Sequence, residues 1–309
     1  MPDTPPRALQ LDVTAEGAMY PPDQQYRLLE VARAADQAGV DFIDTTEHVL
    51  MGLNALRSGQ GWEWHHLEQP QPEPLTTLAA MAGATRRIRL LSAIVIAPLR
   101  PAGLLAKTAA TLHAVSGGRF VMGVTASWQK DKYDALGVPF EQRGQILDDT
   151  IGACRALWAG APASFHSPTV NFDGMFCSPR PAPGERIRVW FGGKFTPRQM
   201  RRVVRLGDGW MPYGGLQMSL AQKAEAVATL RQAFVEAGRD PATLDICDGL
   251  APVDGSVGRT LEQIPARAEA GITVIRVHLR RLAPGPDEVV KTLEEIARRF
   301  EPYRALKVH

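Results

Sequence analysis

The residues best suited to chemistry follow the ends of short apolar runs. One run ends in DTTEHV, which places Glu47 and His48 directly after it. Imidazole exchanges protons near neutral pH, so His48 is the candidate catalytic group, although a structural histidine would fit the same pattern. Glu47 could orient His48 or bind a cofactor, or it could equally face a helix. This strand end is therefore the predicted catalytic position.

A second apolar run ends in GVTASW, where three small residues precede a tryptophan: Thr125, Ala126, Ser127 and Trp128. Small residues let a flat ligand approach the backbone, and Trp128 could wall its ring or fill the core. These four residues are predicted to contact a cofactor.

A third run, IRVWFGGKFTP, ends in Gly192 and Gly193, with Lys194, Thr196 and Pro197 following. Glycine allows close approach, and a helix N-terminus and a lysine both attract anions, so the pattern predicts a phosphate site. The same residues also suit a strand-to-helix turn with Thr196 as N-cap and Pro197 in the first helical position. The two interpretations are compatible.

Further tryptophans are candidates for substrate contact. Trp62 and Trp64 lie in a long segment, 49–73, that we interpret as a lid, with a surface patch as the equal alternative. Trp210 ends another apolar run and could face a substrate or fill the core. On the helix after the GGK turn, Arg201, Arg202 and Arg205 form a basic stretch that is usually a solvated face.

The elements that must position these residues alternate along the chain. Helical patterns end in glycine and continue into short apolar runs at 34–44, 204–212 and 268–277, and again where Gly117 and Gly118 precede RFVMGV. We expect these glycines to be left-handed helix ends and the runs to be buried parallel strands. The other predicted strands are ALQLDV, IRLLSAIVI, IRVWFGG and TLDICDGL.

Eight helical patterns lie between these strands, at 24–38, 74–85, 101–116, 141–158, 197–206, 219–237, 259–270 and 286–300. Eight strands alternating with eight helices predict one α/β domain over residues 1–309, a (β/α)₈ TIM barrel. The segments 49–73, after strand two, and 161–186, before strand five, are predicted insertions over the active-site face.

Composition limits the function classes. The chain has 309 residues and a formal net charge of +2, which gives no electrostatic case for nucleic acid or an anionic membrane. Cys154, Cys177 and Cys247 are far apart in the sequence, so neither zinc nor disulfides are indicated. With no predicted signal peptide or membrane span, we expect a cytoplasmic protein that acts on a small molecule.

Several motifs together resemble the luciferase-like flavin and deazaflavin oxidoreductases. They are EH at 47–48, the stretch from IRLLSAIVIAPLR to SGGRFVMGV, SW-x₄-Y-x-ALGVPFEQRG, FDGMFCSPRPAP, VWFGGK-x-TPRQMRRVVRLGDGWMP and AGI at 270–272. Within that family the spacing most resembles the branch that binds coenzyme F420, a deazaflavin that carries hydride; FMN is the alternative cofactor. The chain departs from the family where GVTASW replaces a glycine-rich run and where Glu47 replaces an aspartate.

The resemblance implies particular roles. His48 would lie beside the cofactor ring, and a non-prolyl cis peptide within Ser92, Ala93 and Ile94 would form a bulge behind it. It also implies a homodimer and, for the FMN branch, a separate cofactor reductase. An oligoglutamate tail on the deazaflavin would favour cations near the mouth.

Three functions compete at this point. The leading hypothesis is F420-dependent hydride transfer to or from a carbonyl, imine, activated alkene or alcohol, with His48 handling the proton. The second is a reduced-FMN monooxygenase, and the third is a non-catalytic flavin-binding relative. A metal-dependent enzyme is disfavoured because no carboxylates and histidines stand at other strand ends as partners of His48.

Overall fold

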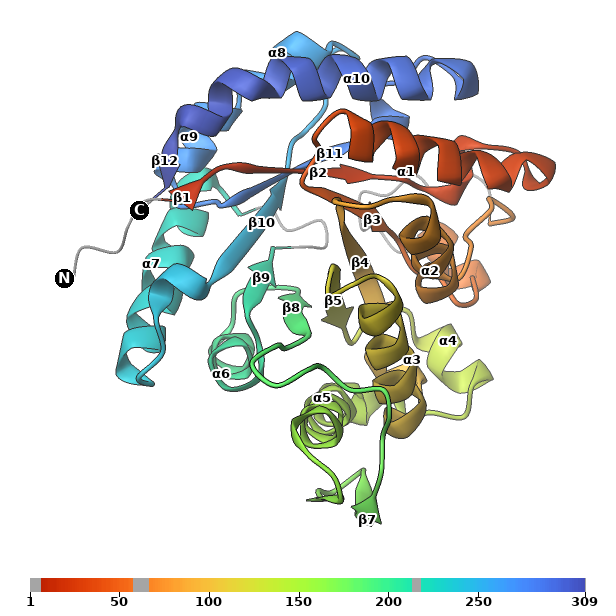
Figure 1. Ribbon diagram of the computed structural model, residues 1–309, viewed down its shortest axis with the longest axis vertical. Coiled ribbons are helices and arrows are strands. Elements are labelled where there is room, and N and C mark those ends of the chain that lie inside the picture. The colour runs from red at the N-terminus through yellow and green to blue at the C-terminus, as the bar shows by residue number, and fades with distance from the viewer. Residues whose placement is uncertain (1–6, 58–66, 213–217, 309) are drawn as a thin grey trace.

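A closed barrel of eight parallel strands forms the centre of the protein. The computed structural model describes residues 7–57, 67–212 and 218–308 (Figure 1). Around the barrel the strands run in the order β2 (Gln10–Thr14), β3 (Phe42–Thr45), β4 (Arg89–Ile96), β5 (Phe120–Thr125), β8 (Arg188–Gly192), β9 (Gly209–Met211), β10 (Asp245–Gly249) and β11 (Val274–His278), and β11 pairs with β2. The predicted (β/α)₈ barrel is confirmed.

Helices surround this barrel in Figure 1. They are α1 (Leu28–Gln37), α2 (Pro74–Ala84), α3 (Ala102–Val115), α4 (Lys130–Ala135), α5 (Arg143–Ala159), α6 (Pro197–Leu206), α7 (Leu220–Glu236), α8 (Val257–Leu261), α9 (Ile264–Glu269) and α10 (Val289–Phe300). The single helix expected at 259–270 is divided into α8 and α9, because Pro265 in the first turn of α9 cannot donate a backbone hydrogen bond to a preceding turn. The short α4 was not predicted.

Two small antiparallel sheets add to the barrel. Strands β6 (Ala163–His166) and β7 (Asn171–Met175) form a hairpin within the predicted second insertion. Strands β1 (Arg7–Ala8) and β12 (Lys307–Val308) pair close to the two ends of the chain. In the first insertion, the structure describes a 3₁₀ turn, Leu53–Arg57.

Glycines end three of the four helices as expected. Gly39, Gly117 and Gly271 have φ values of 75°, 65° and 80°, in the left-handed region that glycine adopts most easily. Gly207 has φ of −101°, so its predicted left-handed conformation is wrong. It is instead a site of close approach, because a Cβ there would lie 2.9 Å from the Phe191 ring.

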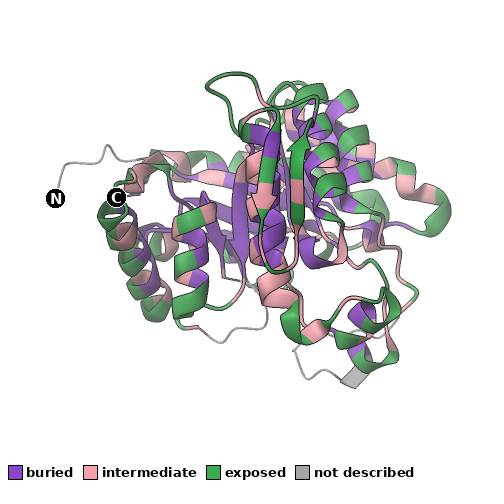
Figure 2. Ribbon diagram, turned by 90° about the horizontal axis from the view of Figure 1, so that it is seen from below, coloured by how far each residue is buried: buried purple, intermediate pink, exposed green. Residues whose placement is uncertain are grey.

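Buried residues fill the barrel and the layer outside it, as Figure 2 shows, and most of them are apolar. Because successive side chains of a strand point to opposite faces, each strand contributes to both layers. Inside the barrel lies a cluster of eight residues, Phe42, Leu91, Ala93, Val121, Trp190, Met211, Cys247 and Val274. A larger cluster packs the strands against the helices.

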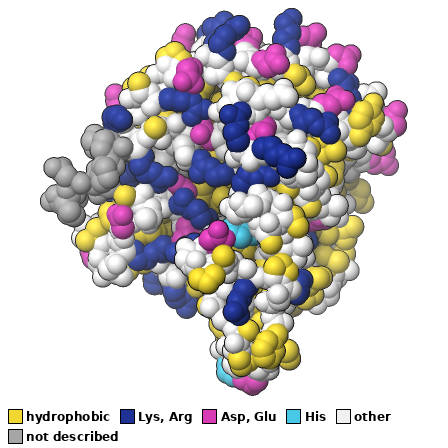
Figure 3. Space-filling view, in the orientation of Figure 1, with side chains coloured by type: hydrophobic (Ala, Val, Ile, Leu, Met, Phe, Trp, Pro, Cys, Tyr) yellow, Lys and Arg dark blue, Asp and Glu magenta, His cyan; other side chains and the backbone are white. Residues whose placement is uncertain are grey.

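Lys and Arg side chains gather across the middle of the face shown in Figure 3. Cys154, Cys177 and Cys247 are all free and buried. In the described parts of the chain, no helix combines the length and the apolar character needed to cross a membrane.

Candidate active site at the carboxyl ends of the strands

A bulge in β4 forms one wall of the barrel mouth. A non-prolyl cis peptide joins Ala93 to Ile94, within the segment where the family resemblance implies one. The β4–β5 pairing shifts register between Ser92 and Val95. The Ser92 hydroxyl spans this irregularity, since it accepts a bond from the Gly123 N–H at 3.0 Å and lies 3.1 Å from the Gly123 carbonyl. Ser92 is fully buried, so it supports the bulge from behind.

The loop after β5 is held in a defined shape. Ser127 has a φ of 59°, and its N–H donates to the Thr125 hydroxyl at 3.4 Å. The Tyr133 hydroxyl, from α4, donates to the Ala126 carbonyl. Thr125, Ala126, Ser127 and Trp128 are all half-buried. The predicted cofactor segment therefore offers accessible atoms on a fixed backbone.

The turn after β8 leads directly into α6. The Gly193 N–H donates to the Met211 carbonyl at 3.0 Å, and the Thr196 hydroxyl caps α6 by accepting from the Gln199 N–H at 3.1 Å. Within the described residues, the backbone N–H groups of Lys194, Phe195 and Thr196 have no hydrogen-bond acceptor. These three donors and the exposed Lys194 side chain lie at a helix N-terminus, which is an arrangement that attracts anions.

A buried lysine contacts His48. The Lys132 ammonium, carried by α4, lies 2.8 Å from His48 Nδ1, and Lys132 is only 1% exposed. Burial and then the charge of Lys132 lower the pKa of His48 to about 3. Burial likewise lowers the pKa of Lys132 to about 8. Near neutral pH the pair is a neutral imidazole beside an ammonium group that is close to its own titration.

This contact fixes the tautomer of His48. An ammonium group has no lone pair, so it can only donate, and Nδ1 must accept. The proton of the neutral ring is then on Nε2. His48 is arranged as a hydrogen-bond donor through Nε2 and not as a free base.

Glu47 makes its contacts away from His48. Its carboxylate accepts from the Ile96 N–H, at the end of β4, and from the Arg100 guanidinium. Arg100 also bonds Glu73 at 2.7 Å, where Glu73 caps α2. Burial raises the pKa of Glu47, although Arg100 opposes the shift. The described contacts of Glu47 brace the end of β4, a role that differs from the sequence-based expectations of orienting His48 or binding a cofactor.

A charged triad lies within the barrel beneath these loops. The Arg276 Nε lies 2.7 Å from Asp12 and 2.9 Å from Asp44, and all three residues are buried. Thr14 donates to the same Asp44 oxygen at 2.8 Å. Two carboxylates share one guanidinium, and burial raises the pKa of Asp44 well above its usual range despite Arg276.

A family model described as luciferase-like monooxygenase matches residues 10–304, which is nearly the whole chain. The chain belongs to the luciferase-like monooxygenase family. An uncharacterized protein of Mycobacterium tuberculosis is 32% identical over 222 residues, 71% of this chain and 72% of its own length.

Solved structures agree with this luciferase-like fold. The monooxygenase RslO1 of Streptomyces bottropensis superposes with a TM-score of 0.76 at 20% identity, over 96% of this chain and all of that one. An F420-dependent secondary alcohol dehydrogenase in complex with an F420–acetone adduct gives 0.75 at 16% identity, over 94% of this chain and 99% of that one. At these identities the likeness establishes the shared barrel.

Trp210 corrects one sequence prediction for this luciferase-like protein. Its side chain is completely buried in the layer between barrel and helices, and its indole N–H donates to the Gly193 carbonyl at 2.9 Å. Met211, the next residue, points into the barrel instead. Trp210 thus presents no surface to a substrate and anchors the turn after β8. Trp62 and Trp64 lie outside the described residues.

Sequence reasoning missed Lys132, Arg100 and the triad around Arg276. Lys132 stands in the charged run QKDKYD, which is typical of a solvated segment, so no pattern marks it as buried. The only available signal was its position four residues after Trp128, close to a strand end. Among the described residues, no group of three or more His, Cys, Asp or Glu side chains is arranged to hold a metal ion.

Proposed function

We propose that the protein is an F420-dependent oxidoreductase that transfers hydride between the deazaflavin and a small carbonyl, imine, activated alkene or alcohol. The observation that carries the proposal is the buried His48–Lys132 contact at the strand ends. Hydride transfer to such a substrate needs one accompanying proton, and this pair is a proton donor with a second proton behind it.

The mouth residues fit a phosphate-bearing ring cofactor. The Ala93–Ile94 bulge and the segment Thr125–Trp128 would lie along the ring. The unpaired N–H groups of residues 194–196, with Lys194, would hold the phosphate at the start of α6. When bound in its reduced form, the deazaflavin supplies the hydride.

The proton follows a path through two side chains. His48 gives its Nε2 proton to the substrate oxygen or nitrogen that becomes protonated on reduction. Lys132 gives a proton to Nδ1, so His48 ends as a neutral ring and Lys132 as a neutral amine. The starting state returns when solvent protonates Nε2 and Nδ1 passes its proton back to Lys132, whose pKa of about 8 allows both of its states near neutral pH.

One titration separates the cofactors. Purified protein is titrated with F420 and with FMN. The reduced complexes are mixed with carbonyls, imines and activated alkenes, and the oxidised complexes are mixed with alcohols. We expect F420 to bind and its oxidised visible absorbance to change with substrate. Binding of FMN alone, with oxygen consumed in step with substrate turnover, would replace this proposal by the second candidate, a reduced-FMN monooxygenase. The description of the matching family model, luciferase-like monooxygenase, supports that candidate.

Replacing His48 by alanine tests the catalytic role. H48A should keep cofactor affinity and lose turnover by roughly 10²- to 10⁴-fold, since a positioned acid contributes about that much. Turnover that is unchanged in H48A would make His48 structural. Cofactor binding without activity in the wild type would indicate a non-catalytic relative.

The proposal also covers the oligomeric state of the protein and its location in the cell. We expect a homodimer, measurable by light scattering, and a cytoplasmic location. A separate reductase is expected only if FMN is the cofactor.

A further inference from the structure

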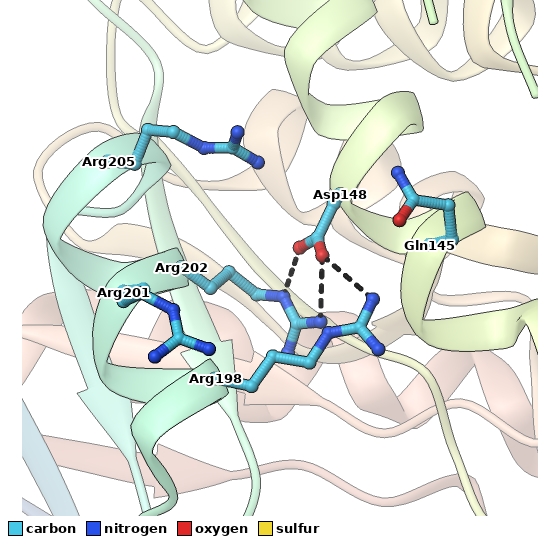
Figure 4. A pocket seen from close by; sticks show the side chains of 6 residues that line it. All are labelled: Gln145, Asp148, Arg198, Arg201, Arg202 and Arg205. Carbon is cyan, nitrogen blue, oxygen red and sulfur yellow. Dashed lines mark hydrogen bonds and ion pairs between the residues drawn. The ribbon is translucent and has the colours of Figure 1, made fainter. Parts of the chain in front are cut away.

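Outside the barrel mouth, a cavity of about 520 Å³ lies between α5 and α6. Its lining residues are Gln145 and Asp148 of α5 and four arginines of α6, Arg198, Arg201, Arg202 and Arg205. The arginines recur at i, i+3, i+4 and i+7, which places them on one face of a helix. Figure 4 shows the four side chains on the side of α6 that borders this cavity.

Two of the arginines are held in place by a single carboxylate. Arg202 is buried and bonds Asp148 through Nε and Nη2, with a further bond of 2.6 Å to Gln199. Arg198 bonds Asp148 Oδ2 at 3.2 Å, the same oxygen that Arg202 Nη2 contacts, and its side chain is 53% exposed. Asp148 therefore orients two guanidinium groups and compensates one of their charges.

The other two arginines lack such partners. Arg201 and Arg205 are exposed, and within the described residues neither makes a hydrogen bond or an ion pair. The lining thus carries four positive charges against one negative charge. Guanidinium groups bind phosphates and carboxylates through paired N–H donors, and four on one face leave a local charge excess that an anion would relieve.

We propose that this cavity binds a small polyanion that carries at least two phosphate or carboxylate groups. Its volume is that of a small-molecule site, and its lining is charged, so an apolar ligand is excluded. Arg201 and Arg205 would bind the ligand directly, and Arg198 would complete the site from its position on Asp148. The proposal stands without the F420 assignment, because it depends only on the α5–α6 surface.

Calorimetric titration with inorganic triphosphate tests it. Wild-type protein should bind triphosphate saturably at the α5–α6 cavity, with affinity that weakens as salt is raised and with weaker binding of monophosphate. The double variant R201Q/R205Q should bind at least about ten-fold more weakly. Both residues are exposed, so the variant should keep its fold, as circular dichroism will show.

A matched control removes the same net charge elsewhere. R33Q/R298Q changes two exposed arginines of α1 and α10 that have no described partner, and it should bind triphosphate like the wild type. Absence of saturable binding, or an equal loss in both double variants, would overturn the proposal.

Two sources of the anion can be distinguished. If triglutamate displaces triphosphate and R201Q/R205Q also weakens F420 binding, the site holds the carboxylate tail of the cofactor. If F420 affinity is unchanged while triphosphate binding is lost, the cavity holds a separate polyanion. Both results support the site, and failure of F420 to bind at all would leave the triphosphate result intact.

Discussion

At the scale of single residues, Lys132 is costly to bury and useful for proton transfer. An ammonium group taken out of water loses several kcal/mol of hydration, and the contact to a neutral imidazole restores little of it. This cost is reflected in the pKa of Lys132, which burial lowers from 10.5 to about 8. The burial of Lys132 is therefore better explained by its contact with His48 than by stability.

Substituting Lys132 by methionine should separate activity from stability. K132M should reduce turnover by about 10- to 100-fold, because Nδ1 of His48 loses its proton donor, while cofactor affinity stays the same. The control K130M removes an exposed lysine of the same helix, paired with Asp134, and should leave turnover unchanged. Steady-state kinetics measures turnover, and titration measures cofactor affinity. Normal turnover in K132M would exclude the proton path from Lys132 through His48.

The same substitution should raise stability in a pH-dependent way. Between the folded pKa of about 8 and the ordinary value of 10.5, the unfolded chain binds a proton at Lys132 that the folded chain does not. Stability of the wild type therefore rises with pH across this window. We expect urea unfolding to show K132M more stable than the wild type at pH 7, by on the order of 2 to 3 kcal/mol, with a smaller difference near pH 10. If the stability difference between K132M and the wild type did not depend on pH, the gain would come from packing and not from the titration of Lys132.

At the scale of elements, the β4–β5 contact shapes the mouth. A Cβ on Gly123 would lie 2.1 Å from the Ser92 carbonyl oxygen, which is backbone and cannot move aside. G123A should lower the free energy of unfolding by about 3 kcal/mol or more. G83A is the matched control on α2, where a new Cβ meets nothing within 4 Å, and it should stabilise by up to about 1 kcal/mol. Thermal and urea unfolding measure both, and a tolerated G123A would show that the bulge can adjust.

The elements were largely predictable from sequence, and the directions of their side chains were not. Buried parallel strands are short and apolar, so all eight could be recognised between glycine-ended helices. Trp210 was assigned to the mouth because it ends such a strand, yet whether it or Met211 points inward depends on barrel register, which a local pattern does not contain. The hairpin of β6 and β7 is mostly exposed, so it lacked the apolar signal of the barrel strands.

The site was predictable in position and less so in contacts. His48 and the turn after β8 could be proposed because polar residues at barrel strand ends converge on one face. Lys132 and Glu47 depend on contacts between segments about 50 to 80 residues apart. Helix α4 is only six residues long, and its charged neighbours hide the burial of Lys132.

At the scale of the whole molecule, Arg276 joins the last barrel strand to the first two. R276Q would leave Asp12 and Asp44 buried without their guanidinium partner and should destabilise the fold by about 3 to 5 kcal/mol. Protonation relieves buried carboxylates, so the loss should grow as pH rises from 5 to 8. Urea unfolding at the two pH values checks this. The control R299Q breaks a half-exposed ion pair with Glu295 and should change the free energy of unfolding by less than about 1 kcal/mol. If both variants lowered stability equally, Arg276 would have no special role in closing the barrel.

The burial of all three cysteines has a practical consequence for studying this protein. Burial raises the pKa of Cys154 and of Cys247, and Cys177 is also enclosed, so the native thiols should react slowly with alkylating reagents. A single new cysteine on an exposed surface would therefore take a fluorophore selectively in the otherwise unaltered chain. Placed at Gln145, which lines the α5–α6 cavity and is not one of its arginines, such a dye would report occupancy of the cavity by its own emission.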